Sequence, residues 1–163
     1  FIIPLVLVSL VSFSSWGDNP NLQDGMTAAD SGDYTTALRH MIPLAEQGLS
    51  FAQDKLGYMY QYGIGVSLNI ENAAKWYKRA ALQGNGNAQT NLGACYSEGV
   101  GVQKDYVRAY MWGDIGASNG SKNGGKLRDW LAKKMTSSQI SEAKKLIQEC
   151  KRCISKTIKR DCC

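Results

Sequence analysis

Several kinds of chemistry that enzymes need are scarce in this sequence of 163 residues. Histidine occurs once, at His40, and no serine or cysteine nucleophile has an evident base beside it. The acidic residues are scattered, without a spacing typical of paired catalytic carboxylates. The glycine-rich segments 63–65 and 99–101 both lack the Lys-Ser/Thr ending of a phosphate-binding loop. We therefore expect no catalytic residues, no metal site and no cofactor, and we expect that the protein is not an enzyme.

Cysteine is absent from the first 94 residues, and four of the five cysteines lie close to the C-terminus. Cys95 lies in an apolar helical pattern and is expected to be a buried small side chain. The other four have the spacing C-x2-C-x8-C-C, for which disulfides are favoured in an exported protein; unpaired thiols and a metal or redox site are the alternatives. The odd total leaves one thiol over or permits an intermolecular bond, and so a disulfide-linked dimer. The disulfide candidates are Cys150, Cys153, Cys162 and Cys163.

Aromatic residues are absent after Trp130, although this part of the chain is strongly basic. Residues 122–163 contain 12 Lys and Arg against 4 Asp and Glu, whereas residues 1–121 contain 7 against 10. A basic segment can bind an acidic partner, a membrane surface or nucleic acid, but a solvated helix face and tail is the simpler interpretation. Because no aromatic side chain is available there to stack on bases, we expect no nucleic-acid partner.

The first 13 residues are almost wholly apolar, and small residues follow them at positions 14–17. This pattern is typical of the hydrophobic core and cleavage region of a secretory signal peptide. We expect residues 1–17 to be the remnant of such a signal, without its initiator methionine and basic segment, and the mature protein to be periplasmic or secreted by bacterial export. The run is short for a transmembrane span, so membrane contact is expected only if this segment stays uncleaved. A buried apolar helix is the alternative.

The rest of the sequence nearly repeats itself every 36 residues. Residues 50–85 align with residues 86–121 without a gap, and residues 37–48 match half a unit more. A fixed period in this range indicates stacked supersecondary units, which present an extended surface to a partner. The paired positions include Ala52 and Ala88, Gln53 and Gln89, Leu56 and Leu92, Gly57 and Gly93, and Trp76 and Trp112.

Each unit is predicted to consist of two helices. Ser50 and Gln53 have the spacing of a capping box at the start of the first helix. That helix should end near Tyr62, because a glycine-rich turn follows. Asn69 is expected to cap the second helix of the first unit, and Asp105 its counterpart in the second unit.

The small residues inside these helices predict close helix packing. Gly57 and Gly93 lie mid-helix, where glycine costs about 1 kcal/mol relative to alanine. The same cost at the same position of both units indicates a close approach, with Trp76 and Trp112 as candidate rings over the gap. His40 occupies the position of these tryptophans in the preceding half unit, and is expected to be a packing residue.

The pattern A-Q-x-x-L-G-x-x-Y-x-x-G-x-G-V, followed by A-x-x-W and A-x-x-G, resembles the Sel1-like repeat, a cousin of the tetratricopeptide repeat. The resemblance covers about residues 32–121 and implies an all-α, right-handed α/α superhelical solenoid that binds proteins or peptides. The second unit departs at Gly113 and Gly116, which predicts a less straight second helix. A Cys153–Cys162 bond, tying the tail to the last helix, would resemble the endings of Sel1-like proteins.

In related two-helix repeats the first helix of each unit forms the concave wall. Phe51, Tyr58 and Tyr62 would then be aromatic side chains in a binding groove, of the type enriched in hot spots. Packing of these aromatics against neighbouring repeats is the alternative. The candidate binding residues are Phe51, Asp54, Tyr58, Gln61 and Tyr62 in the first unit, and Asn87, Thr90, Ala94, Ser97 and Glu98 in the second.

The expected organisation is a signal remnant at residues 1–17, a solenoid at 18–121 and a C-terminal helical cap with a basic, Cys-rich tail at 122–163. The solenoid comprises a degenerate unit at 18–49 and the repeats 50–85 and 86–121. In the degenerate unit, a short helix at 21–31 pairs with a helix at 33–47 that Pro43 should kink. In the cap, a helix at 126–135 precedes a capping box at Thr136 and Gln139, which starts an amphipathic last helix.

The expected function is a non-catalytic scaffold that docks a protein or peptide in the concave groove. One alternative is a cell-envelope protein that binds or hydrolyses β-lactams, like some cysteine-rich Sel1-like proteins; those, however, pair cysteines within each repeat. Another is a structural adaptor that dimerises through a tail cysteine.

Overall fold

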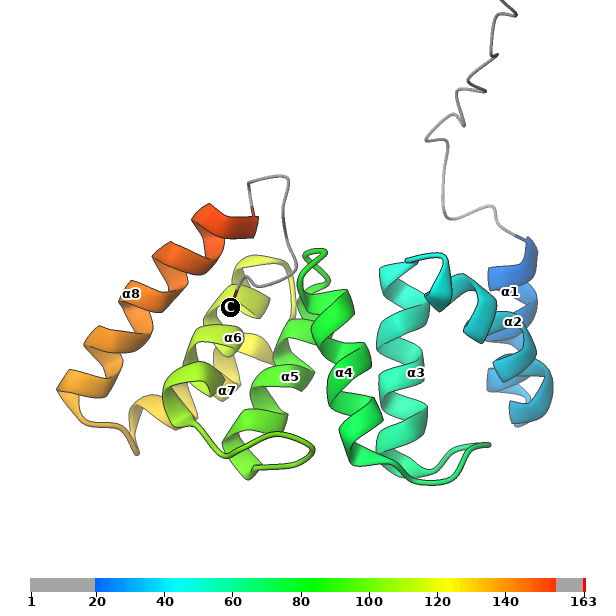
Figure 1. Cartoon of the computed structure of the whole chain (residues 1–163), viewed down its shortest axis with the longest axis horizontal. Coiled ribbons are helices and arrows are strands. Elements are labelled where there is room, and N and C mark those ends of the chain that lie inside the picture. Colours follow the sequence, from blue (N-terminus) through cyan, green and yellow to red (C-terminus); the bar gives the residue numbers. More distant parts are fainter. Residues whose placement is uncertain (1–19, 155–162) are drawn as a thin grey trace, which may run out of the picture.

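The computed structural model describes residues 20–154 and Cys163. Within this part of the chain the regular structure is all helical, and successive helices follow one another along the long axis of the molecule (Figure 1). This arrangement confirms an all-α repeat solenoid. The residues of the expected signal remnant, 1–17, lie outside the described residues. The eight described helices are α1 (Pro20–Asp30), α2 (Tyr34–Glu46), α3 (Ser50–Tyr62), α4 (Ile70–Ala81), α5 (Gly86–Glu98), α6 (Tyr106–Ser118), α7 (Gly124–Ala132) and α8 (Ser137–Ile154).

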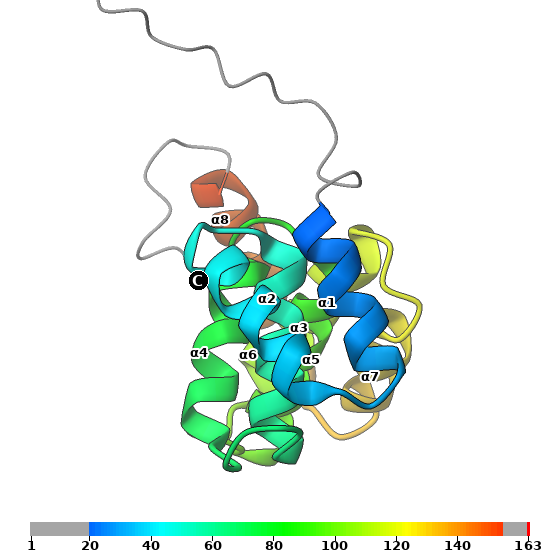
Figure 2. The ribbon, with the colours of Figure 1, turned by 90° about the vertical axis from the view of Figure 1, so that its right-hand side faces the viewer.

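The helices pack as consecutive pairs. Helix α1 packs on α2, α3 on α4, and α5 on α6, while α2–α3 and α4–α5 contacts join one pair to the next. Helix α7 packs on both α5 and α6, and α8 packs on α6. Viewed along the long axis, α1 and α7 lie toward one side and α2 and α4 toward the other (Figure 2). We call the side formed by α1, α3, α5 and α7 the first-helix face.

Two apolar clusters form the interior. The first joins α1, α2 and α3 around Leu44 and Leu56, with the Trp76 ring of α4 packed against it. The second joins α4 to α8 around Tyr77, Trp112 and Leu131. Burial of these large side chains supplies the main driving force for stacking the pairs. Within the described residues, no helix combines the length and the hydrophobicity needed to span a membrane.

Most of the predicted helix ends agree with the structure. Helices α3 and α5 are followed by the C-cap residues Gly63 and Gly99, whose φ angles of 66° and 77° are left-handed. The Asn69 side chain accepts a hydrogen bond from the Asn72 amide at 2.9 Å, and the Asp105 carboxylate accepts one from the Arg108 amide at 3.0 Å. These caps fix where α4 and α6 begin.

The predicted capping box at Ser50 and Gln53 is wrong. The N-cap residue of α3 is Leu49, and no side chain caps the helix. Gln53 is instead buried, and its Nε2 donates to the Ala45 carbonyl of α2 at 2.9 Å. Its Oε1 accepts a 2.7 Å bond from Gln83 Nε2. The side chain therefore joins α3 to the preceding pair and is unavailable to cap its own helix.

The equivalent glutamine of the next repeat makes two hydrogen bonds of the same kind, and we call this arrangement the glutamine bracket. Gln89 is fully buried, and its Nε2 donates to the Ala81 carbonyl at 2.9 Å. Its Oε1 accepts a 2.8 Å bond from Asn119 Nδ2. Each of these glutamines thus hydrogen-bonds a last-turn carbonyl of the helix before it, where helices leave carbonyls without partners in the helix.

The glycines inside the helices permit close packing, but not under the predicted rings. An ideal Cβ at Gly57 would lie 2.6 Å from ring carbons of Tyr77, whereas Trp76 is only half-buried. At Gly93, a Cβ would lie 3.0 Å from the Ala109 carbonyl oxygen and from Leu127 Cδ2. The close approach is confirmed, and the assignment of the tryptophan rings to it is wrong.

Helix α6 continues from Tyr106 to Ser118 through both of its interior glycines. A Cβ at Gly113 would lie 3.2 Å from the Gly124 carbonyl of α7, and one at Gly116 would lie 2.5 Å from Thr90 Oγ1 of α5. The departure from the first repeat therefore admits neighbouring helices on two sides of α6.

The two ends of the solenoid also form helices. Helix α2 continues past Pro43 to Glu46, and half-buried His40 packs with its Cβ against Gly25 of α1. In the cap, α7 spans slightly earlier residues than predicted. The capping box of α8 is confirmed, because Thr136 N donates to Gln139 Oε1 at 2.9 Å and Gln139 N donates to Thr136 Oγ1 at 3.2 Å.

Candidate functional site

Helix α3 presents two tyrosines to solvent on the first-helix face. Tyr58 and Tyr62 are 49% and 57% exposed, and their ring centroids lie 4.7 Å apart with tilted planes. Phe51, two turns before, is half-buried, and the Lys55 ammonium lies 5.3 Å from the centre of its ring. Of the three aromatics expected in the groove, two are therefore available to a partner as exposed rings.

The polar candidates on α3 are held by neighbouring helices. Gln61 Oε1 accepts a 2.8 Å hydrogen bond from the Tyr77 hydroxyl of α4. Asp54 Oδ1 accepts a 3.0 Å bond from Asn91 Nδ2 of α5, a residue outside the predicted set. Burial raises the pKa of Asp54 above its usual value, although the bond from Asn91 and the charge of Lys55 oppose that shift. These contacts fix the orientation of α3 between its neighbours.

The candidates on α5 differ in their exposure. Asn87 and Glu98 are exposed and Ala94 is half-buried, whereas Thr90 and Ser97 are buried. The Thr90 hydroxyl is hydrogen-bonded to the Gly86 carbonyl at 3.0 Å and to the Ser121 hydroxyl at 2.8 Å, and Ser97 Oγ donates to the Ala94 carbonyl. Because these two hydroxyls have partners inside the solenoid, we leave Thr90 and Ser97 out of the surface offered to a partner.

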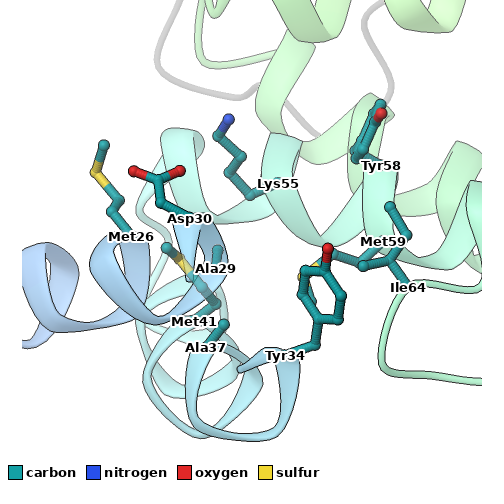
Figure 3. Close-up of a pocket in the computed structure, with 10 residues that line it drawn as sticks. All are labelled: Met26, Ala29, Asp30, Tyr34, Ala37, Met41, Lys55, Tyr58, Met59 and Ile64. Carbon is teal, nitrogen blue, oxygen red and sulfur yellow. The ribbon is translucent and has the colours of Figure 1, made fainter. Parts of the chain in front are cut away.

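A pocket with a volume of about 270 Å³ opens between α1, α2 and α3 (Figure 3). Three methionines contribute to its apolar lining, and Tyr34 and Tyr58 contribute aromatic rings. We call it the α1–α3 pocket. Its lining residues are Met26, Ala29, Asp30, Tyr34, Ala37, Met41, Lys55, Tyr58, Met59 and Ile64.

Only Tyr58 of the candidate binding residues lines the α1–α3 pocket. The residues from α1 were missed because this helix precedes the half unit that matches the repeat, so no aligned position pointed to them. Lys55 was missed because its position is not among those carried over from related repeats. Its position three residues before Tyr58, which places both on one face of the predicted helix, is the signal that could have identified it.

Charged groups lie at one edge of this pocket. Asp30 is the exposed last residue of α1, and Lys55 projects from α3 near the same edge (Figure 3). Among the described residues, neither takes part in an ion pair. Asp33, in the turn after α1, accepts a 3.1 Å hydrogen bond from the Thr36 amide, and hydrogen bonding by Thr36 lowers the pKa of this carboxyl. The turn between α1 and α2 is therefore acidic.

The C-terminal cysteines join the tail to the last helix. Cys150 of α8 forms a disulfide with Cys163, with 5.2 Å between the Cα atoms. Cys153 is disulfide-bonded as well, and Cys162, the partner predicted for it, lies outside the described residues. Cys95 is a buried free thiol, and burial raises its pKa to about 11. In the described part of the chain, no group of His, Cys, Asp and Glu is arranged to hold a metal ion.

A second hollow, of about 300 Å³, lies beside this disulfide, where α6 meets α8. Arg108 and Glu149 contribute charge to it, and Met111 and Leu146 contribute apolar surface. None of the candidate residues on α3 and α5 lines it.

Comparison with known proteins places these features in a wider group. The family model described as "Sel1 repeat" matches residues 50–85 and 86–121. A structure of c5321, a protective antigen of uropathogenic Escherichia coli displaying an SLR fold, superposes with a TM-score of 0.75 and 32% identity over 78% of this chain. A Sel1 repeat protein from Oxalobacter formigenes superposes with a TM-score of 0.64 and 33% identity over 68% of this chain.

The chain spans only part of each of these relatives. It covers 28% of the E. coli protein and 45% of the Oxalobacter protein. The chitin synthase regulator SKT5 of Saccharomyces cerevisiae is 40% identical over 57 residues, which are 35% of this chain and 8% of the yeast protein. The resemblance therefore concerns a part of each relative and not the whole of any.

Proposed function

We propose, from the premise that this chain is a Sel1-repeat protein with two repeats at residues 50–121, that it is a non-catalytic scaffold of the cell envelope or secreted space. Its first-helix face docks a protein or peptide in a concave groove. The observation that carries this proposal is the exposed pair Tyr58 and Tyr62 beside the α1–α3 pocket. Exposed aromatic rings next to an apolar hollow are typical of binding hot spots.

Two further observations support a binding role. Repeat solenoids use extended surfaces for recognition, and the helices of this one are held by hydrogen bonds between neighbouring pairs, which keep such a surface in shape. The yeast relative is named as a regulator of an enzyme, in keeping with a protein that acts through another protein.

Export is proposed from the apolar first 13 residues and from the cysteine pairing near the C-terminus. Disulfides persist in oxidising compartments and are rare where glutathione keeps thiols reduced. A fusion of residues 1–17, completed with an initiator methionine and a basic segment, to a reporter that is active only outside the cytoplasm tests this part of the proposal: an inactive reporter with normal expression contradicts it.

An affinity capture from the parent cell envelope tests the docking function. The bait is the protein from Asp18 onward, and a Tyr58→Ala/Tyr62→Ala variant is run beside it. We expect a partner that the wild type retains and the variant loses. A Leu68→Ala variant, which removes an exposed apolar side chain from the loop before α4, is the control and should retain the partner. If the tyrosine variant keeps the same partner, the assignment of the groove is wrong.

The alternative of β-lactam binding or hydrolysis rests on cysteine-rich relatives. In the described residues, the Cys150–Cys163 bond joins the tail to α8 and does not lie within a repeat, so this feature is not the one those proteins have. A hydrolysis assay and a direct titration with a β-lactam separate this alternative from the scaffold.

A disulfide-linked dimer is the remaining alternative, and non-reducing electrophoresis tests it. The free thiol among the described residues, Cys95, is buried and so is poorly placed for an intermolecular bond. A band at twice the monomer mass that disappears on reduction would favour the structural adaptor.

A further inference from the structure

We propose that the α1–α3 pocket is the anchor site of the groove, and that it takes one bulky apolar side chain of a peptide whose neighbouring residue is lysine or arginine. This inference rests on the proposed docking function and adds the chemistry of the partner. It is drawn from the size, the lining and the charges of the pocket.

The volume of the pocket suits a single side chain. At about 270 Å³, it is smaller than the roughly 300–1,000 Å³ typical of sites for drug-sized ligands. A stable dimer would bury about 1,200–2,000 Å² of surface, which one hollow of this size does not provide. A leucine, methionine or phenylalanine projecting from an extended peptide can fill the hollow while the rest of the peptide lies along α3.

The lining suits an apolar side chain that varies in shape. Met26, Met41 and Met59 come from three different helices and meet at this pocket. Methionine is flexible and polarisable, so it adapts to different apolar occupants. Tyr34 and Tyr58 are 40% and 49% exposed, and their rings can cover the occupant while their hydroxyls remain in water.

The charge on the α1 side of the pocket favours a cation. Asp30 is exposed and outside any ion pair of the described residues, and Asp33 is exposed in the turn that follows. The C-terminal end of a helix carries a partial negative charge, and α1 has no basic residue in its last turn to balance it. The Asp30 carboxylate and the C-terminal end of α1 therefore lie at the edge of the pocket, and the Asp33 carboxylate, which caps α2, lies in the turn that follows.

The lysine near the same edge of the pocket does not cancel this field. Lys55 lies close enough to Asp54 for its charge to act on that carboxyl, and its ammonium also lies over the Phe51 ring. The positive charge of Lys55 is thus partly offset by the Asp54 carboxylate on the same helix. The unbalanced charge at the edge of the pocket is that of Asp30, which is why the partner residue next to the anchor is expected to be basic.

A peptide-display selection against the full-length oxidised chain tests the inference. The probe is a library of random 12-residue peptides, and we expect enrichment of sequences in which a bulky apolar residue lies next to lysine or arginine. A selected peptide is then synthesised in three forms: unchanged, with the apolar residue replaced by alanine, and with the basic residue replaced by glutamine.

Two variants examine the two parts of the site. Ala29→Phe fills the pocket, and should weaken the unchanged peptide at least tenfold but leave the alanine form little changed. Asp30→Lys reverses the charge, and should weaken the unchanged peptide about fivefold but the glutamine form by less than twofold. Asp24→Lys makes the same charge change on α1 at an exposed residue that does not line the pocket, and is the matched control. If Ala29→Phe fails to fold by circular dichroism, the Asp30→Lys result decides.

The possible outcomes distinguish a failure of the anchor-site inference from a failure of the proposed docking function. Selected peptides that lack the apolar–basic pair, or that bind both variants as wild type does, overturn the inference but leave docking in place. A selection that enriches no peptide contradicts the docking function as well. If sedimentation shows a wild-type dimer that Ala29→Phe dissociates, the occupant is a second copy of this chain and the peptide inference is wrong.

Discussion

Gly57 shows how a single residue sets the distance between two helices. A Cβ placed there would lie 2.6 Å from ring carbons of Tyr77, which is itself fully buried. The ring has no room to move away, because it is packed in the apolar cluster that joins α4 to α8. The glycine is therefore kept for packing, despite its lower helix propensity.

We expect Gly57→Ala to destabilise the protein by about 1–3 kcal/mol, because overpacking outweighs the gain in helix propensity. The control is Gly125→Ala in α7, where the nearest atom would be 3.9 Å from the new Cβ. That variant should gain about 0.5–1 kcal/mol. Urea unfolding measures both free energies, and equal stabilities of the two variants would contradict the packing role of Gly57.

The buried carboxyl of Asp54 makes the stability of the protein depend on pH. Burial raises its pKa in the folded protein above the unfolded value, so the ionised carboxylate destabilises the fold at neutral pH. This cost disappears as the pH falls below the unfolded value of about 4. Asp54→Asn keeps an acceptor for Asn91. We expect the variant to be more stable than wild type at pH 7, and the difference to shrink toward pH 3 in thermal unfolding. A difference that does not depend on pH would show that the carboxylate carries no such cost.

Among the helices, the same capping-box spacing in the sequence caps α8 but does not cap α3. Ser50 with Gln53 and Thr136 with Gln139 have the same capping-box spacing, but only the second pair caps a helix. Gln53 lies inside the solenoid, where the Ala45 carbonyl and Gln83 compete for its side chain. Thr136 is exposed at the end of the solenoid, with no neighbouring helix to compete. Local spacing predicts a cap only where tertiary packing leaves the side chain free to make it.

We expect Thr136→Ala to destabilise α8 by about 1 kcal/mol, the usual cost of losing an N-cap side chain. Ser50→Ala, at the position where the capping box failed, should change stability by less than about 0.5 kcal/mol, since most surface substitutions have effects of that size. Denaturant unfolding of both variants checks the pair. An equal loss for both would mean that Ser50 does act as a cap in solution.

Local signals in the sequence account for the parts of the fold that could be predicted. The repeat period, the positive-φ glycines and the caps at Asn69 and Asp105 are such signals, and the structure agrees with them. The ring predicted over Gly57 was wrong because residues one apart on a helix point in different directions, and only packing decides between Trp76 and Tyr77. The α1–α3 pocket needed α1, which lies outside the matched repeats.

At the scale of the whole molecule, the two apolar clusters predict two regions of different response. The first cluster lies in α1 to α3 and the second in α4 to α8, and the main contacts of each helix pair are with its neighbours. In repeat solenoids, stability is close to a sum of local terms. A change at the C-terminal end should therefore alter the local stability of α8 and α6 and have little effect on that of α2.

The Cys150–Cys163 bond permits a direct test. The bond joins residues 13 apart, and loss of a natural disulfide typically costs about 2–4 kcal/mol. In the double variant Cys150→Ser/Cys163→Ser, we expect faster amide hydrogen exchange in α8, where the bond is made, and unchanged exchange in α2 and α3. Uniformly faster exchange in all helices would show that the molecule unfolds as one cooperative unit.

The glutamine bracket allows the number of repeats in such a chain to change during evolution. Gln53 reaches the carbonyl eight residues before it, at Ala45, and Gln89 reaches the carbonyl eight residues before it, at Ala81. Loss of residues 50–85 as one block would place Gln89 eight positions after Ala45 and so restore the same junction. Gain of a block would likewise create the junction anew. A gene encoding this chain can therefore lengthen or shorten by whole repeats, in a single recombination event, without new contacts having to evolve at the seam.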